Sequence, residues 1–192
     1  MKYKILKEDI VYNDYFKIKK ATLLHDTFNS DTQIEVVRQS FERGNAIAIV
    51  LVEKDTASVL LINQFRYPIV TDPNCDGWLL EIVAGSIEGD EDPELCARRE
   101  VEEEIGYQVK NMEFIGEYFV SPGGASEKVN AFYAEVHSTD KIFEGGGLDT
   151  EQEDIQLVKI PLSAIREKLN SNAIKDAKTI IALQWMLLNK SY

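Results

Sequence analysis

The sequence predicts an α+β fold, built as a mixed sandwich rather than as a regular alternation of strands and helices. Three observations predict it. Alternating or apolar segments fill the first half of the 192-residue chain, one helix with clear start and stop signals begins near residue 93, and two helical segments close the chain. Strands followed by a helix, further strands and further helices are typical of this class.

The first half of the chain contains two kinds of predicted strand. Two segments partly alternate between apolar and polar residues, as half-buried antiparallel strands do, and three others are mostly apolar. Residues 53–56 have the composition of a hairpin turn between two of the apolar segments. The five predicted strands cover 15–23, 33–41, 45–52, 58–64 and 78–83.

The predicted helix at 93–105 has a signal at each end. Asp92 suits the N-cap and Pro93 suits the first helical position. Gly106 can adopt the positive φ that commonly ends a helix. Beyond it, the patterns predict strands at 109–120, 129–136 and 155–160, and helices at 161–169 and 176–188.

The overall charge excludes some classes of partner. The formal net charge is −12, which argues against a nucleic-acid or anionic-membrane binder that uses a general basic surface. The longest clear apolar run, 46–52, is too short to span a bilayer, and the first residues have no secretory signal pattern. Two cysteines and two distant histidines make neither a disulfide framework nor a metal set, so we expect reduced thiols in a cytoplasmic protein.

Three adjacent glutamates lie on the predicted helix, beside its buried face. At 100° per residue, Ala97, Val101 and Ile105 form an apolar stripe, and two carboxylates one turn apart border it. The carboxylates in question are Glu100 and Glu104, with Glu103 on the flank, Glu102 pointing to solvent, and Arg99 placed to orient Glu103.

Such a carboxylate pair repels itself unless a cation neutralises it. Oxygen ligands on a rigid element suit Mg²⁺ or Mn²⁺. The alternative, judged from helical geometry alone, is a solvated helix face made of good helix formers.

The spacing of the glycines, glutamates and arginine favours the metal site. Gly85, five residues, Glu91, seven residues and then REVEEEIGY at 99–107 match the Nudix box, with Tyr107 as the one loose match. The chain therefore resembles the Nudix hydrolases. This resemblance implies an α/β/α sandwich around a mixed sheet at 43–192, preceded by a small antiparallel β region at 1–42.

The resemblance also implies roles for residues of the box. Glu100 and Glu104 resemble the main metal ligands of the family, assisted by Glu103. Ala84 matches a position whose backbone carbonyl also binds metal, Arg99 matches the residue that holds the glutamates, and Gly85 allows a close backbone approach. The implied cofactor is Mg²⁺, with Mn²⁺ as an alternative.

Segments outside the box resemble the branch that hydrolyses nucleoside diphosphate sugars. EIVAG at 81–85 resembles the segment that leads into the box, and GGGLDTEQEDIQL at 145–157 resembles an acidic loop that closes over substrate. In that loop Glu151 best matches the general base. Glu153 is the alternative base and a candidate metal ligand. An exposed acidic turn is the competing interpretation of the loop alone.

Other positions match substrate-binding residues of that branch. Arg66 matches an arginine on the phosphates or nucleotide, and Glu127 matches a position near the terminal sugar. Tyr15 and Arg38 match positions that reach the base and sugar across a dimer interface, and Lys178 is a further candidate. Strand packing and solvated surface charge are the alternatives for these side chains.

The resemblance predicts a Mg²⁺-dependent pyrophosphatase that forms a homodimer. FERGNAIAIVL, the triple glycine at 145–147 and IKDAKT favour GDP-mannose, giving GMP and mannose 1-phosphate. Pro122, sixteen residues after Gly106, also occurs in ADP-ribose hydrolases, so hydrolysis of ADP-ribose to AMP and ribose 5-phosphate is the alternative. A non-cleaving sensor would be expected to lose metal-ligand carboxylates, and an mRNA-decapping enzyme would need a basic path that the chain lacks.

Overall fold

The computed structural model describes residues 1–28, 32–148, 150 and 152–192. Its contacts divide the chain into two compact units. The smaller unit comprises Met1–Asn45 and Phe119–Lys128, and the larger comprises Ala46–Tyr118 and Val129–Tyr192. The domain boundary predicted after residue 42 stays a prediction. No helix within the described ranges has the length and apolar character needed to cross a membrane.

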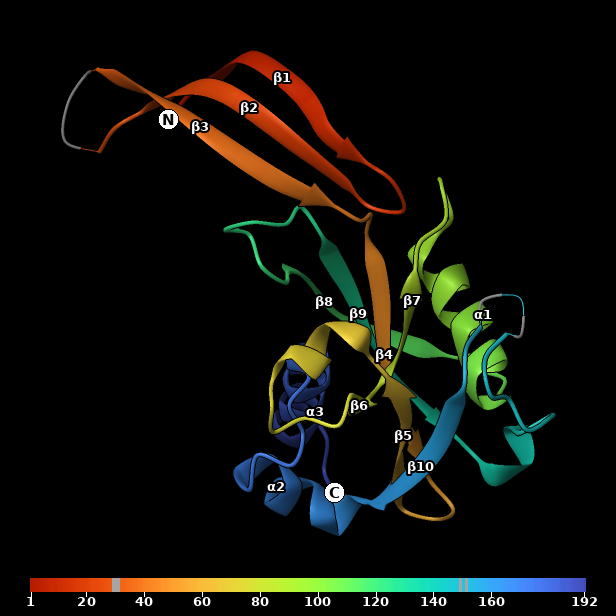
Figure 1. Ribbon diagram of the computed structural model, residues 1–192. Helices are drawn as coiled ribbons and strands as arrows, with labels where there is room; N and C mark the ends of the chain where they lie inside the picture. The colour runs from red at the N-terminus through yellow and green to blue at the C-terminus, as the bar shows by residue number, and fades with distance from the viewer. Residues whose placement is uncertain (29–31, 149, 151) are drawn as a thin grey trace. The chain divides into compact units, whose positions relative to one another are not determined.

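The smaller unit contains an antiparallel sheet of three strands, coloured red to orange in Figure 1. The strands are β1 (Tyr3–Asn13), β2 (Lys17–Asp26) and β3 (Gln33–Glu42), in that spatial order. The sequence patterns did not predict β1. Its pairing with β2 shifts register at two places, and each shift interrupts the two-residue alternation by which a strand is recognised.

The larger unit is built on a mixed sheet of seven strands. Strand β4 (Ala46–Glu53) is central, and it runs parallel to β9 (Lys128–Val136) and antiparallel to its other partners. The remaining strands are β5 (Ser58–Phe65), β6 (Trp78–Glu81), β7 (Val83–Ser86), β8 (Met112–Phe119) and β10 (Ile155–Pro161).

The strand predicted at 78–83 is two strands. It divides at Ile82, whose backbone N–H donates to the Thr179 hydroxyl at 2.8 Å instead of continuing a ladder. As a result β6 pairs with β5, and β7 pairs with β4. This division turns the chain toward the next helix, which carries the glutamates.

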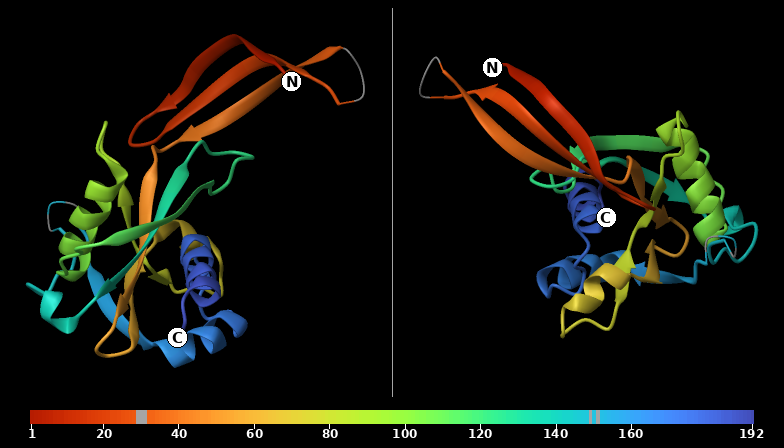
Figure 2. Two further views of the ribbon diagram at one scale, coloured as in Figure 1. Left: turned by 180° about the vertical axis from the view of Figure 1, so that it is seen from behind. Right: turned by 45° about the horizontal axis from the view of Figure 1, so that its top comes forward.

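Helices cover both faces of this sheet, as the two views of Figure 2 show. Helix α1 (Pro93–Ile105) lies on one face, and α2 (Leu162–Asn170) and α3 (Ala177–Asn189) lie on the other. The connections include short 3-10 helices at Tyr67–Thr71 and Ser138–Asp140. The predicted α+β sandwich with a mixed sheet and an N-terminal antiparallel sheet is confirmed.

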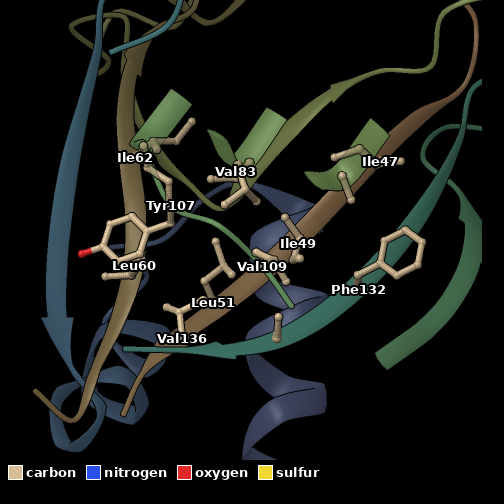
Figure 3. Close-up of a cluster of buried hydrophobic side chains, with 14 of the residues drawn as sticks. Ile47, Ile49, Leu51, Leu60, Ile62, Val83, Tyr107, Val109, Phe132 and Val136 are labelled. Carbon is tan, nitrogen blue, oxygen red and sulfur yellow. The ribbon is translucent and has the colours of Figure 1, made fainter. Parts of the chain in front are cut away.

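The apolar side chains of β4 contribute to both hydrophobic clusters of the larger unit, one on each face of the sheet. The strand's side chains alternate between faces, so Ile47, Ile49 and Leu51 join the cluster under α1 (Figure 3), whereas Ala48 and Val50 join the cluster under α3. A strand buried on both faces has no polar side, and this explains why the segment is apolar throughout.

Candidate active site

Helix α1 begins and ends where its sequence signals predict. The Asp92 side chain accepts hydrogen bonds from the backbone N–H groups of Glu94 and Leu95, and Pro93 follows in the first turn. Gly106 ends the helix with φ 72°, and its N–H donates to the Glu102 carbonyl. The caps set the ends of the helix, and the packing of Ala97, Val101 and Ile105 into the core sets the direction of its glutamates.

The four glutamates in the second half of α1, at positions 100 and 102–104, differ in exposure as the helical geometry predicts. Glu104 is 2% exposed, and the side chains of Glu100 and Glu103 are 13% and 26% exposed. Glu102 is exposed. A carboxylate is rarely buried without a partner, so the burial of Glu104 points to a function or to an unusual environment.

Arg99 joins two of the glutamates on α1 to Glu91 in the preceding loop. Its Nη1 lies 2.9 Å from Glu103 Oε2 and 2.9 Å from Glu100 Oε1, while Nε and Nη2 each lie 3.1 Å from a Glu91 oxygen. The hydrogen bonds from Arg99 lower the pKa of Glu91 to about 2. The predicted contact between Arg99 and Glu103 is confirmed, and Glu91 is a further partner.

Strand β7 approaches the helix so closely that one position must be glycine. A Cβ built on Gly85 would lie 1.9 Å from Cδ of Glu100. The constraint is space, because the Glu100 carboxyl group rests directly on the strand. Ala84, which pairs with Ala48 of β4, precedes it on the same strand.

The electrostatics of Glu100 and Glu104 favour a bound cation. Burial raises the pKa of Glu100 to about 7, although Arg99 opposes this. Burial, Glu100 and Glu153 raise the pKa of Glu104 well above its usual range. Glu104 Oε2 is buried and has no hydrogen-bond partner among the described residues.

The types of donor atom therefore fit a divalent cation, the cofactor class that the resemblance implies. In the parts of the chain that the structure describes, no three His, Cys, Asp or Glu side chains already converge as a metal site. Glu100 instead contacts Arg99. An orphaned buried carboxylate oxygen beside a second carboxylate is nevertheless an arrangement that a hard cation would stabilise.

The triple glycine at 145–147 packs against the end of α1. Gly146 N donates to the Glu104 carbonyl at 2.8 Å, and Gly147 N donates to the Glu103 carbonyl at 3.2 Å. A Cβ on Gly147 would lie 2.5 Å from Cβ of Glu153. The two backbone hydrogen bonds hold the glycines against the glutamate-bearing end of α1, and the charge of Glu153 acts on both Glu100 and Glu104. Glu151 lies outside the described residues.

Two cationic candidates meet at a carboxylate that the sequence analysis did not single out. Arg66 Nη2 lies 2.7 Å from Glu81 Oε2, and Lys178 Nζ lies 3.2 Å from Glu81 Oε1. Glu81 is 2% exposed. The signal available in the sequence was a glutamate inside the apolar run WLLEIVAG, where an unpaired charge would be costly.

The remaining candidates, Tyr15, Arg38 and Glu127, belong to the smaller unit. Tyr15 is exposed and stacks edge-on against Phe16, and the Arg38 guanidinium donates to the Val37 carbonyl. Glu127 is buried, 3.4 Å from Arg43 Nε. The structure thus brings the box residues, Glu153, Arg66 and Lys178 together in the larger unit and places these three residues in the other.

Several known proteins are similar to this chain over most of its length. A model of the NUDIX domain matches residues 42–183. A protein of Cronobacter sakazakii named GDP-mannose pyrophosphatase is 37% identical to this chain, and the match covers 96% of this chain and 94% of that protein. A protein of the same name from Yersinia enterocolitica is also 37% identical, and the match covers 96% of this chain and 95% of that protein. A crystal structure of an ADP compounds hydrolase has the same fold, with a TM-score of 0.74 at 22% identity, covering 98% of this chain and 94% of the other.

Proposed function

This chain belongs to the Nudix family, and we propose that it hydrolyses the diphosphate bond of GDP-mannose to give GMP and mannose 1-phosphate. The observation that carries the reaction class is the pair Glu100 and Glu104 on α1, one of them with a buried and unsatisfied oxygen. The names of relatives that match almost the full chain support the substrate.

The proposed cofactor is Mg²⁺, which Mn²⁺ can replace. Glu100, Glu103 and Glu104, the Ala84 carbonyl and Glu153 would hold it. When bound, it would offset the negative charge of the diphosphate and lower the pKa of a coordinated water molecule. Arg99 restrains two of the carboxylates so that they need not rearrange when substrate binds.

The chain's own groups supply the remaining chemistry. Glu151 accepts the proton of the attacking water, with Glu153 as the alternative base. Arg66 and Lys178 place positive charge beside the phosphates, where arginine can form two parallel hydrogen bonds. Gly85 lets the carboxyl group of Glu100 approach the backbone, beside the position proposed for the diphosphate. Tyr15, Arg38 and Glu127 contact the base and sugars, because they match the substrate-binding positions named above.

ADP-ribose is the second candidate substrate, because the position of Pro122 is associated with ADP-ribose hydrolases as well as with GDP-mannose relatives. The same metal site and the same base would act on either compound, since both contain the P–O–P bridge. A non-cleaving sensor is disfavoured because Glu100, Glu103 and Glu104 are all present. We also propose that the protein is a cytoplasmic homodimer in which Tyr15 and Arg38 of one subunit reach the site of the other.

Product identification tests the proposal. Purified protein is incubated with GDP-mannose and Mg²⁺, and the products are separated by anion-exchange chromatography. The proposal expects GMP and mannose 1-phosphate in equal amounts, formed with Mg²⁺ and not with excess EDTA. Release of GDP and free mannose would contradict cleavage of the diphosphate bond. Equal rates with and without EDTA would contradict a metal-dependent reaction.

A further inference from the structure

Glu81 is a buried carboxylate at the point where β6 ends. Both of its oxygens are occupied: Oε2 accepts from Nε and Nη2 of Arg66 at 3.2 and 2.7 Å, and Oε1 faces Lys178 at 3.2 Å. A charge this deeply buried is costly unless it is paired on every side, and here each oxygen has a cationic partner.

The two cations that Glu81 holds remain partly open to solvent. The side chain of Arg66 is 36% exposed and that of Lys178 is 18% exposed, whereas the side chain of Glu81 is 3% exposed. Among the described residues, Arg66 Nη1 makes no hydrogen bond, so one edge of the guanidinium is free to bind an anion. The charge of Arg66 also acts on Glu104, so Arg66 lies within electrostatic range of a carboxylate of α1.

A second set of contacts ties Lys178 to the same strand break. Asp176 caps α3 by accepting from Thr179 N at 2.9 Å, and its other oxygen lies 2.9 Å from Lys178 Nζ. The Thr179 hydroxyl donates to Asp176 at 2.5 Å and accepts from Ile82 N at 2.8 Å. The start of α3 is therefore fixed to the residue that follows Glu81.

We propose that Glu81 is a positioning residue that orders Arg66 and Lys178 as a pair of cations for the substrate's diphosphate. Long cationic side chains lose rotamer freedom when they bind an anion. Glu81 removes that freedom during folding, so less is lost when substrate binds. Glu81 itself touches no substrate, because its carboxylate is enclosed by the two cations. This inference rests on the proposed function for the role of Arg66 and Lys178.

The test is a double-mutant cycle read by binding and by kinetics. Calorimetry measures the Kd for inorganic pyrophosphate in the presence of Mg²⁺, and a coupled assay measures kcat and KM for GDP-mannose. For Glu81→Gln we expect Kd and KM to rise about tenfold, since two side chains must be ordered anew, with kcat changed less. In the Arg66→Ala, Lys178→Ala background, adding Glu81→Gln should change Kd less than about threefold.

Glu53→Gln is the matched control. Glu53 is also buried and is paired with a lysine, Lys159. It is the last residue of β4, whereas Ile47, which pairs with Gly85, lies near the start of that strand. Substitution of Glu53 should leave Kd and KM within about twofold. If Glu81→Gln does not fold, as judged by circular dichroism, Glu81→Asp enters the same cycle, because it keeps the charge and withdraws it by one methylene.

Two results would overturn the inference. One is a Kd for pyrophosphate that Glu81→Gln leaves unchanged. The other is a loss of pyrophosphate affinity on Glu81→Gln that is equally large when Arg66 and Lys178 are already alanine. The pyrophosphate-binding measurement tests the positioning role of Glu81 separately from the proposed function. A wild-type protein that binds pyrophosphate in a Glu81-dependent way but cleaves no nucleoside diphosphate sugar would contradict the proposed function and support the positioning role.

Discussion

At the scale of single residues, Glu104 is the side chain whose environment points most directly to a chemical role. It lies on the border of the buried stripe of α1, and its Oε2 has no partner in the described part of the chain. Glu102, two residues earlier on the same helix, is exposed. Two glutamates of one helical turn thus have opposite environments, and this difference supplies a matched pair of substitutions.

Replacing Glu104 tests whether its charge serves a cation. We expect Glu104→Gln to lower kcat by a factor of about 10³ or more at fixed Mg²⁺, with folding intact, because it keeps the shape of the side chain and removes a ligand charge. Glu102→Gln should leave kcat unchanged. Steady-state kinetics and circular dichroism measure both effects. A Glu104→Gln rate close to that of the wild type would remove Glu104 from the site.

The general base can be assigned by comparing Glu151 and Glu153. We expect Glu151→Gln to lower kcat by a factor of about 10² to 10⁴, the usual contribution of a general base, with little change in metal affinity. Glu153→Gln should instead weaken metal binding, because the charge of Glu153 acts on Glu100 and Glu104. Mg²⁺ titrations of activity separate these effects. The reverse pattern would assign the base to Glu153.

At the scale of elements, α1 was predictable and the strands around it were less so. Asp92, Pro93 and Gly106 are local signals, and the helix obeys them to the residue. The break at Ile82 depends on Thr179, which lies 97 residues away, and no local pattern carries such a contact. Strand β1 was missed for a different reason, because its two register shifts obscure the alternation.

A buried ionic cluster joins β4, β10 and the segment after α1, and it makes stability depend on pH. Glu53 accepts from Lys159 at 2.7 Å and from the Tyr107 hydroxyl at 2.6 Å. Burial raises the pKa of Glu53, but hydrogen bonds from Lys159, Thr56 and Tyr107 outweigh it and leave the pKa below 4.5. A carboxylate with a lowered folded pKa stabilises the fold above its unfolded pKa and loses that contribution in acid.

The expected consequence is measurable by urea unfolding at several pH values. Glu53→Gln should lower the free energy of unfolding at pH 7 by roughly 1–3 kcal/mol, the typical worth of hydrogen bonds to a charged group. The difference between wild type and variant should shrink as the pH falls below 4.5, through the lowered pKa of Glu53. A difference that stays constant down to pH 3 would show that the charge of Glu53 does not stabilise the fold.

At the scale of the whole molecule, the sequence predicted the class of fold and the box better than the environment of the site. The spacing from Gly85 to Tyr107 specified the helix, its glutamates and the close approach at Gly85. It did not single out Glu81, whose partners Arg66 and Lys178 come from β5 and the start of α3. Contacts between distant segments arise only when the sheet assembles, so a pattern within one segment cannot reveal them.

The proposed homodimer is also a statement about the whole molecule. The sheet of β1 to β3 exposes several large apolar side chains, including Tyr3, Ile10 and Tyr12, which a partner subunit would cover. Multi-angle light scattering at micromolar concentration should give about twice the chain mass of 21.8 kDa. A mass equal to one chain would contradict the dimer and the exchange of Tyr15 and Arg38 between sites.

The most direct test of the central claim is a side-by-side comparison of kcat/KM for GDP-mannose and ADP-ribose with Mg²⁺, with phosphate release coupled through a phosphatase. We predict a preference of about tenfold or more for GDP-mannose, equivalent to about 1.4 kcal/mol in the transition state. A preference for ADP-ribose would contradict the substrate while leaving the metal site in place. Activity on neither compound, with Mg²⁺ binding demonstrated, would contradict the proposed hydrolysis itself.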